Sequence, residues 1–244
     1  LPITSDDQIV VIPDGVLYNL PFAALVDDND QYLVESHLLS LAPSMRSLLD
    51  TKSGMPAALS VLVASGETPG ERTETNQISR AVHPEPISTL GERDLSSLEE
   101  AVKGKSVLHF ATALPLADSN PIAVPIPFTG DDKERKATTG SLFGLKLPSD
   151  LVVLSGTAVK GDKLEGTAVQ IVSRGLAYAG AKNVMMTLWP IEPSQRISEL
   201  VNFYKNKKQG LNAARSLRQA QLLSMSRNRS PRNWASFQLL GVGM

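Results

Sequence analysis

The chain has 244 residues, of which 42% are hydrophobic and 20% charged, and its formal net charge is −1. That size fits one large domain or two small ones, and the composition is ordinary for a soluble globular protein. The absence of cysteine excludes disulfides, thiolate metal sites and a cysteine nucleophile. No stretch approaches the ~20 apolar residues of a membrane span and no signal peptide opens the chain, so we expect a cytoplasmic protein without a membrane segment.

Short apolar runs bounded by turn residues predict strands along the chain. These runs lie at 8–13, 38–43, 58–66, 106–112, 151–155, 183–189 and 234–241. Most of them are continuous rather than alternating, which is typical of strands that are buried on both faces.

Helical patterns separate the predicted strands. They lie at about 72–82, 94–102, 168–179, 197–204 and 212–224, with a further helix starting after 43. In 168–179, apolar and small residues recur three and four positions apart, as on one face of an amphipathic helix. Gly180 stands where the cap that ends this helix is expected, and Asn212 is suited to begin the last one.

This alternation predicts one α/β domain over 1–244, with a mostly parallel central sheet of about six strands and helices on both faces. We expect 106–112 and 151–155 to be adjacent interior strands. Because sites in such sheets lie beyond the carboxyl ends of the strands, the turns after these two are the candidate site. Residues 115–140 hold four prolines and a charged cluster, which predicts a mobile loop.

The turn after 151–155 contains Ser155, Gly156 and Thr157, at a place where α/β enzymes carry a nucleophile. No glycine-rich phosphate motif and no G-x-S-x-G elbow is present. His109 lies inside the predicted strand 106–112, so we interpret it as a core histidine.

The chain has two further histidines and two tryptophans. We interpret His37 as a half-buried packing residue and His83 as an exposed loop residue. With so few histidines and no cysteine, we expect neither a metal site nor a cofactor. We interpret Trp189 and Trp234 as anchors of the core or of turns.

Positive charge gathers near the end of the chain. Between residues 203 and 244 there are eight lysines and arginines and no acidic residue. Such a segment can meet nucleic acid or an acidic partner, but it lacks interleaved aromatic residues on which bases stack. We therefore interpret it as a solvated helix face with a basic loop, and we do not expect nucleic acid as a partner.

Taken together, several segments resemble the CHAT family, the caspase-like domains often found behind TPR repeats. The similar segments are "IVVIPDGVLYNLPFAAL" (9–25), "VESHLLSLAPS" (34–44), "SVLHFAT" (106–112), "LVVLS" (151–155), "GLAYAGAKNVMMTLWPIEP" (175–193), "ARSLRQAQ" (214–221) and "WASFQLLG" (234–241). The resemblance implies a three-layer caspase-hemoglobinase fold and a cysteine peptidase with its His and Cys on adjacent strand ends. It also implies, with Leu1 in place of a starting Met, the C-terminal part of a longer protein.

The residues that the family uses for catalysis are replaced in this chain. By the resemblance, the position of the catalytic His is Ala113 and that of the catalytic Cys is Thr157. The Gly after the His is Leu114, and a family acid after the strand that ends at Trp189 corresponds to Pro193. We interpret these differences as natural loss of the catalytic pair.

The sequence therefore predicts a catalytically inactive, pseudopeptidase domain that binds or regulates a protein or peptide. TPR repeats of the same parent chain are one such partner. The residual cleft is expected at Thr112, Leu114, Ser155, Gly156, Trp189 and Pro193. Two alternatives stay open: a hydrolase that uses Thr157 or Ser155 with an unrecognised base such as Lys160 or Lys163, and a purely structural cap on neighbouring repeats.

Overall fold

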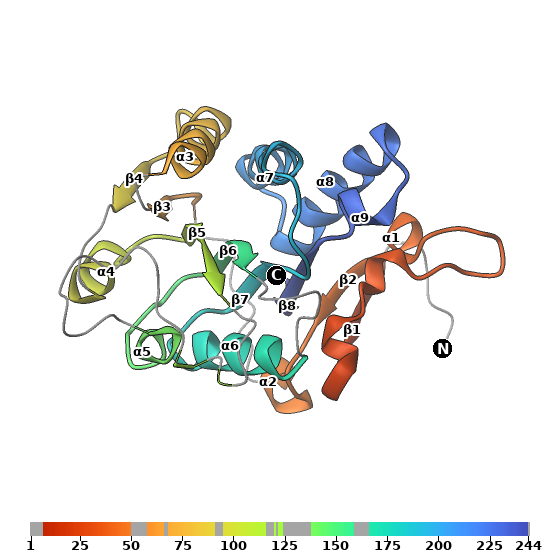
Figure 1. Ribbon diagram of the computed structural model, residues 1–244, viewed down its shortest axis with the longest axis horizontal. Coiled ribbons are helices and arrows are strands. Elements are labelled where there is room, and N and C mark those ends of the chain that lie inside the picture. Colours follow the sequence, from red (N-terminus) through yellow and green to blue (C-terminus); the bar gives the residue numbers. More distant parts are fainter. Residues whose placement is uncertain are drawn as a thin grey trace.

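The computed structural model describes residues 7–49, 58–65, 68–90, 95–115, 120, 122–123, 138–158 and 166–243. A central sheet is covered by helices on both faces, which gives three layers (Figure 1). Its strands are β1 (Gln8–Val11), β2 (Leu38–Leu41), β3 (Val61–Ala64), β4 (Ile87–Leu90), β5 (Val107–Pro115), β6 (Leu151–Ala158), β7 (Asn183–Thr187) and β8 (Phe237–Gly241).

The strand order in the sheet is β1-β2-β8-β7-β6-β5-β3-β4, and all pairs are parallel except β7–β8. The prediction of a mostly parallel sheet is confirmed, and so is the prediction that β5 and β6 are adjacent and interior.

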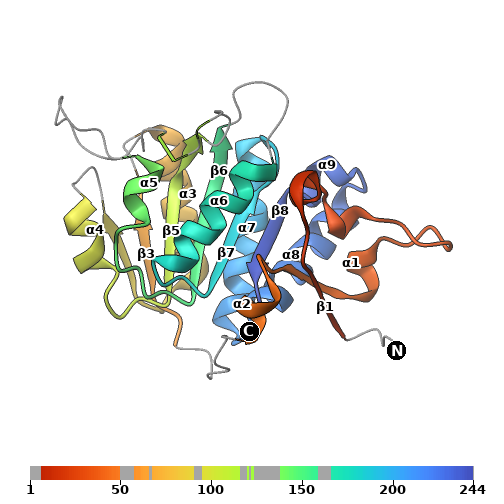
Figure 2. The same ribbon diagram turned by 90° about the horizontal axis from the view of Figure 1, so that it is seen from below.

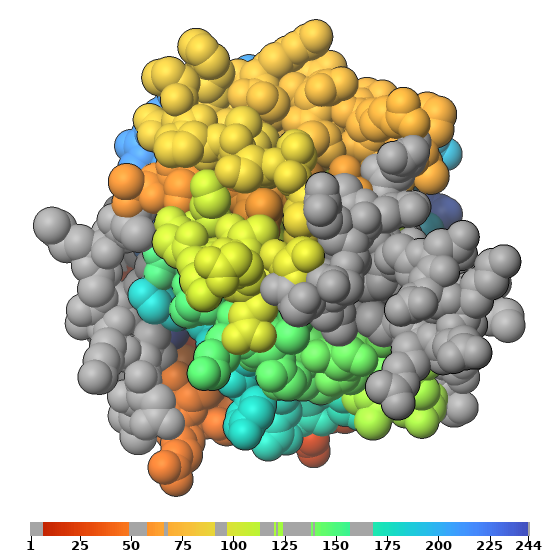
Figure 3. All heavy atoms as spheres, turned by 90° about the vertical axis from the view of Figure 1, so that its left-hand side faces the viewer, coloured from red at the N-terminus to blue at the C-terminus, as the bar shows by residue number. Residues whose placement is uncertain are grey.

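The sheet has eight strands rather than about six. Sequence reasoning missed β4, because two of its four residues, Ser88 and Thr89, are polar and so short a run carries a weak strand pattern. Figure 3 looks onto this end of the sheet, where α3 to α5, coloured from yellow-orange to green, form the surface.

The helices follow the predicted alternation with the strands. They are η1 (Gly15–Asn19) and η2 (Phe22–Ala24), which are 3₁₀ turns, and α1 (Leu33–Ser36), α2 (Met45–Leu49), α3 (Pro69–Val82), α4 (Leu95–Ala101), α5 (Thr139–Leu142), α6 (Gly166–Tyr178), α7 (Pro193–Lys208), α8 (Ala213–Arg227) and α9 (Pro231–Trp234). The two expected caps are in place. The side chain of Asn212 accepts a hydrogen bond of 2.8 Å from the Arg215 amide, and Gly180 has a φ of +112° after α6.

Several element boundaries differ from the prediction, and two of the differences have a local explanation. Helix α3 starts at Pro69 rather than near 72, because Thr68 and Glu71 form a reciprocal capping box at its first turn. Trp234, predicted as the start of the last strand, ends α9 instead, since the preceding proline at 231 opens a helical turn. Strand β8 begins at Phe237.

Alternate residues of the same strands are buried on the two faces of the sheet. Leu108 and Phe110 of β5 pack with Leu154 of β6 in the layer that contains α4, α5 and α6. Val107 and Val153 pack on the opposite face, beneath α3, α7 and α8. Covering both faces explains why these strands are continuously apolar.

The predicted mobile loop at 115–140 lies largely outside the described residues, so it stays a prediction. None of the helices in the described ranges combines the length and the apolar character that crossing a bilayer requires.

Candidate functional site

Strands β5 and β6 project beyond their other neighbours at the carboxyl edge of the sheet (Figure 2). They pair with each other as far as Pro115 and Ala158. Within the described strands, the register of β5 with β3 ends at Phe110, and the register of β6 with β7 ends at Leu154. Residues 111–115 and 155–158 therefore form a two-stranded projection, and each of its strands has lost its outer strand partner.

The positions that the family resemblance assigns to the catalytic pair lie on this projection. Ala113 pairs with Gly156, and Leu114 pairs with Thr157, so the backbones of Ala113 and Thr157 are one register step apart. The register shifts between Phe110 and Ala113, where β5 advances three residues while β6 advances two. Such a bulge re-aims the end of a strand and is frequent beside active sites.

The base of the projection is buried. Thr112 is 2% exposed and Ser155 is fully buried, and Gly156 is also buried. A hydroxyl at Ser155 is therefore closed to a substrate in this structure. It approaches the carboxylate of Glu74, whose pKa it helps to lower, without forming a well-directed hydrogen bond.

The two remaining residues of the predicted cleft have other surroundings. Trp189 is half-buried after β7 and packs against the cluster around the buried Trp234. Its indole N–H donates a hydrogen bond of 3.0 Å to the carbonyl of Arg232. Pro193 is exposed and forms the first turn of α7. Both tryptophans thus serve as anchors, as predicted.

His109 is a core histidine, as predicted, and both of its nitrogens are engaged. Nδ1 lies 2.9 Å from the Tyr204 hydroxyl, and Nε2 lies 2.8 Å from a carboxylate oxygen of Glu74. Arg196 contacts the other oxygen of Glu74 at 2.9 Å. The side chains of His109 and Glu74 are completely buried, so His109 is held in the core and does not reach the projection.

The charges around Glu74 decide its ionisation. Burial alone raises the pKa of this carboxyl, but the hydrogen bond with His109 and the electrostatic effects of His109 and Arg196 outweigh burial and lower the pKa. Sequence reasoning missed this cluster. The available signal was an acidic residue at 74, one helical turn before Ile78 on the buried face of α3.

A second buried acid, Glu199 on α7, has the opposite environment. Neither of its carboxylate oxygens has a hydrogen-bond partner among the described residues. Burial raises the pKa of Glu199 well above its ordinary value, because a low-dielectric site disfavours the charged form.

The other two histidines lie elsewhere in the fold. His83 follows α3 ahead of β4, near the amino end of that strand. His37 immediately precedes β2, which runs antiparallel to β7 and is separated from β6 by β8 and β7 in the strand order. His37 is half-buried and His83 exposed, as predicted. Among the described residues, no group of three or more histidine or acidic side chains is arranged to hold a metal ion.

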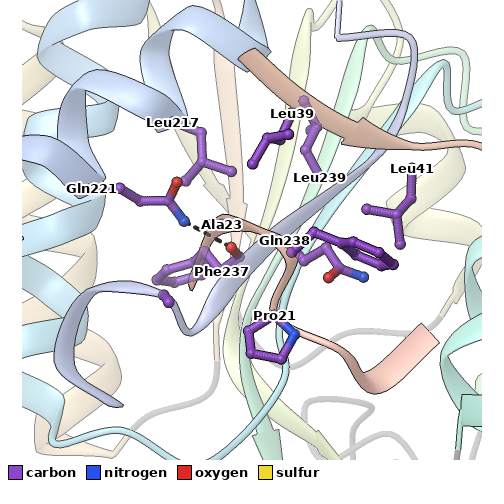
Figure 4. Close-up of a pocket in the computed structure, with 11 residues that line it drawn as sticks. Pro21, Ala23, Leu39, Leu41, Leu217, Gln221, Phe237, Gln238 and Leu239 are labelled. Carbon is purple, nitrogen blue, oxygen red and sulfur yellow. Dashed lines mark hydrogen bonds between the residues drawn. The ribbon is translucent and has the colours of Figure 1, made fainter. Parts of the chain in front are cut away.

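Two pockets found between described residues do not include the predicted site residues. One of about 20 Å³ lies between η2, β2, α8 and β8 (Figure 4), where β2 and β8 share only one register pair. There the Gln221 side chain donates to the Phe237 carbonyl at 3.0 Å. The other, of about 610 Å³, lies at the amino edge between α2, α6 and the end of β8.

The CHAT domain model matches residues 2–242. The chain belongs to the CHAT domain family. The family resemblance seen in the sequence is thereby confirmed.

Two curated proteins with similarity to this CHAT domain are tetratricopeptide repeat protein 28 of Homo sapiens, at 25% identity, and of Mus musculus, at 24% identity. Each alignment covers 98% of this chain and 12% of the relative, so the chain spans about an eighth of the length of these relatives.

Solved structures show the fold of the CHAT domain. Two crystal structures of the Saccharomyces cerevisiae separase–securin complex match with TM-scores of 0.59 and 0.57, at 10% sequence identity. Each match covers 92% of this chain, and 14% and 15% of the respective matched chains. The likeness establishes a caspase-like fold.

Proposed function

We propose that this CHAT domain is a cytoplasmic, catalytically inactive caspase-like module that binds a protein partner through the β5–β6 projection. The observation that carries the proposal is the projection itself. Beyond Phe110 and Leu154, its outer backbone edges have no partner among the described strands. An extended peptide can add to such an edge by main-chain hydrogen bonding, while side-chain contacts give specificity.

The residue inventory supports the absence of peptidase chemistry. The chain contains no cysteine and three histidines in all. One histidine is buried with both nitrogens engaged, one lies at the amino end of β4, and one precedes β2, which β8 and β7 separate from β6. A cysteine peptidase needs a thiolate and an imidazole within hydrogen-bond reach of each other, and this chain supplies neither at the projection.

The alternative of a serine or threonine hydrolase has less support. Ser155 is fully buried, so a substrate cannot approach its hydroxyl without a rearrangement of the strand. A Thr157 nucleophile would need an adjacent base to take its proton, and no histidine is available for that role. Lys160 and Lys163, the other bases considered, lie outside the described residues.

The relatives support a protein as the partner. The curated relatives are named for tetratricopeptide repeats, and separase occurs in its structures in complex with securin. We infer that the partner of this domain is likewise a polypeptide, with tetratricopeptide repeats of the same parent chain as one candidate.

The test uses linear peptides selected from a displayed random library against the purified domain. We expect binders that protect backbone amides within 111–115 or 155–158 from hydrogen exchange, and that remain uncleaved. In an extended peptide, every second backbone N–H points toward the edge to which the peptide binds. Methylating those nitrogens removes the donors without changing the side chains and should abolish binding, whereas methylating the other set of alternate nitrogens should not. Binders that protect only other parts of the domain, or that tolerate both methylation patterns, would overturn the proposal.

A further inference from the structure

Both tryptophans of the chain hold one short segment in place. Trp189 donates its indole N–H to the carbonyl of Arg232 at 3.0 Å, and Trp234 donates to the carbonyl of Arg229 at 3.2 Å. These are the two tryptophans of the chain, and both bonds hold the backbone of residues 227–232. We name residues 227–232 the arginine segment.

Local hydrogen bonds fix the arginine segment further. The Asn228 side chain accepts from the Ser230 amide at 3.0 Å, and the Ser230 carbonyl accepts from Asn233 at 2.9 Å. The Pro231 carbonyl accepts from Ala235 at 2.8 Å. The proline also restricts φ at its own position. The backbone of this connection between α8 and α9 is therefore organised before any partner arrives.

The side chains on this backbone are exposed cations. Arg227, Arg229 and Arg232 are all exposed, and none of them belongs to a salt bridge found among the described residues. Arg227 makes a long contact of 3.4 Å with the Ser198 hydroxyl. No acidic residue occurs between 203 and 244 to neutralise them from the same part of the chain.

The acidic residues of a neighbouring hairpin do not neutralise these cations either. That hairpin packs through Tyr32 against Trp234, with ring centroids 4.9 Å apart, and carries Asp27, Asp28 and Asp30. The Asp27 carboxylate accepts hydrogen bonds from two amides of its own turn. No salt bridge found in the described part of the chain joins this hairpin to the arginine segment.

The arginine segment lies at the same edge of the sheet as the β5–β6 projection. Thr187, the last residue of β7, pairs with Phe237, the first residue of β8, and Leu188 donates to the Ser236 carbonyl. The residues that precede β8 are therefore next to the turn that follows β7. Figure 2 shows α9 and the end of β6 at this edge.

We propose that the arginine segment binds an aspartate- and glutamate-rich stretch of the partner protein. The proposal rests on the proposed function, because it assigns the charge of a partner that the projection binds. Guanidinium groups pair with carboxylates through two parallel hydrogen bonds, and a prearranged backbone lowers the entropy lost on binding. Both tryptophan rings are occupied in packing, so they are not available as a stacking platform for nucleic acid bases.

The test is fluorescence anisotropy with a labelled 16-residue peptide of alternating Glu and Ser, compared with a peptide in which Gln replaces Glu. The wild-type domain should bind only the Glu peptide, and more weakly at 300 than at 50 mM NaCl. The triple variant Arg227→Ala, Arg229→Ala, Arg232→Ala should lose about tenfold in affinity.

A matched control removes three exposed cations from the other edge: Arg80→Ala, Lys205→Ala and Arg215→Ala, at the last turns of α3 and α7 and the first turn of α8. This variant should bind within about twofold of the wild type. Equal losses in the two triple variants, or no binding of the Glu peptide by the wild type, would overturn the proposal.

A third probe separates the classes of partner. A single-stranded oligonucleotide of equal charge should bind more weakly than the Glu peptide. If it binds more tightly and depends on the same three arginines, the segment is a nucleic-acid site and the proposal is wrong.

The library-selected peptides distinguish a failure of this inference from a failure of the proposed function. If they bind at the projection while the Glu peptide does not bind at the arginine segment, this inference fails and the proposed function stands.

Discussion

His109 and Glu74 form a completely buried hydrogen bond of 2.8 Å although 35 residues separate them in the chain. Arg196 contacts the second oxygen of Glu74, so the pair joins β5 to both α3 and α7. A histidine that stands in the family's strand motif thus belongs to the structural core.

Replacement of Glu74 by Gln should lower the free energy of unfolding by about 3 kcal/mol at pH 7, because it leaves Arg196 without its counter-charge in a buried site. The pKa of Glu74 is lowered in the fold, so the stabilisation is present above the ordinary carboxyl pKa and is lost as the pH falls through the folded value. Denaturant titrations from pH 3 to 7 measure this.

Glu100→Gln is the matched control for Glu74, because Glu100 pairs with Lys103 at the surface and is 76% exposed. It should change the unfolding free energy by less than about 1 kcal/mol. Equal costs at positions 74 and 100 would contradict a stabilising role for the buried cluster.

Replacement of Glu199 by Gln should stabilise the protein at pH 7. The pKa of Glu199 is raised in the fold, so the folded state holds a proton that the unfolded state releases above its ordinary pKa. The free energy of unfolding therefore falls as the pH rises above the pKa that Glu199 has in the unfolded state. It falls by about 1.4 kcal/mol per pH unit until the pH reaches the pKa that Glu199 has in the folded state. Gln removes this dependence, so the gain should grow from pH 5 to pH 7 in denaturant titrations.

The exposed Asp28 offers a control for Glu199. Asp28→Asn removes an acid from the surface and should show no such growth between pH 5 and pH 7. A constant effect of Glu199→Gln across this range would mean that the acid is ionised in the folded protein.

The wild-type domain should leave a fluorogenic peptide library intact. The reason is that neither a thiol nor a histidine is present at the projection. Mass spectrometry of the library after incubation is the measurement. Cleavage by the wild type that disappears in Thr157→Ala would show that this threonine is a nucleophile.

Introducing the missing pair tests the assignment of the two positions. Ala113 and Thr157 lie one register step apart on adjacent strands, and neighbouring strands are about 4.8 Å apart. In the double variant Ala113→His, Thr157→Cys, an imidazolium beside the thiol should depress its pKa. The engineered cysteine should react with iodoacetamide at pH 6 faster than in Thr157→Cys alone.

We expect no full peptidase activity from the double variant, because Leu114 and Pro193 still differ from the family pattern. Equal alkylation rates in the single and double variants would mean that the two side chains do not approach each other, and that the positions have been assigned wrongly.

Much of the fold could be predicted from the sequence. The runs that became β5 and β6 are continuously apolar, and such strands require cover on both faces, which leads to a parallel sheet with helices above and below. Helix α6 was equally predictable, because its spacing and the terminal Gly180 are local signals. Edge strand β4 was missed, since four half-polar residues carry too weak a pattern.

Sequence alone also determined the chemical inventory: with no cysteine and three histidines, the family's catalytic pair is missing whatever the fold. Only the tertiary structure decided where the remaining polar groups went. Glu74 and Tyr204 meet His109 across separations of 35 and 95 residues, and the Trp189 indole reaches the Arg232 carbonyl across 43 residues. These contacts depend on strand order and helix packing, because groups distant in the chain come within hydrogen-bond range only after the layers assemble, and no local pattern records such a pairing.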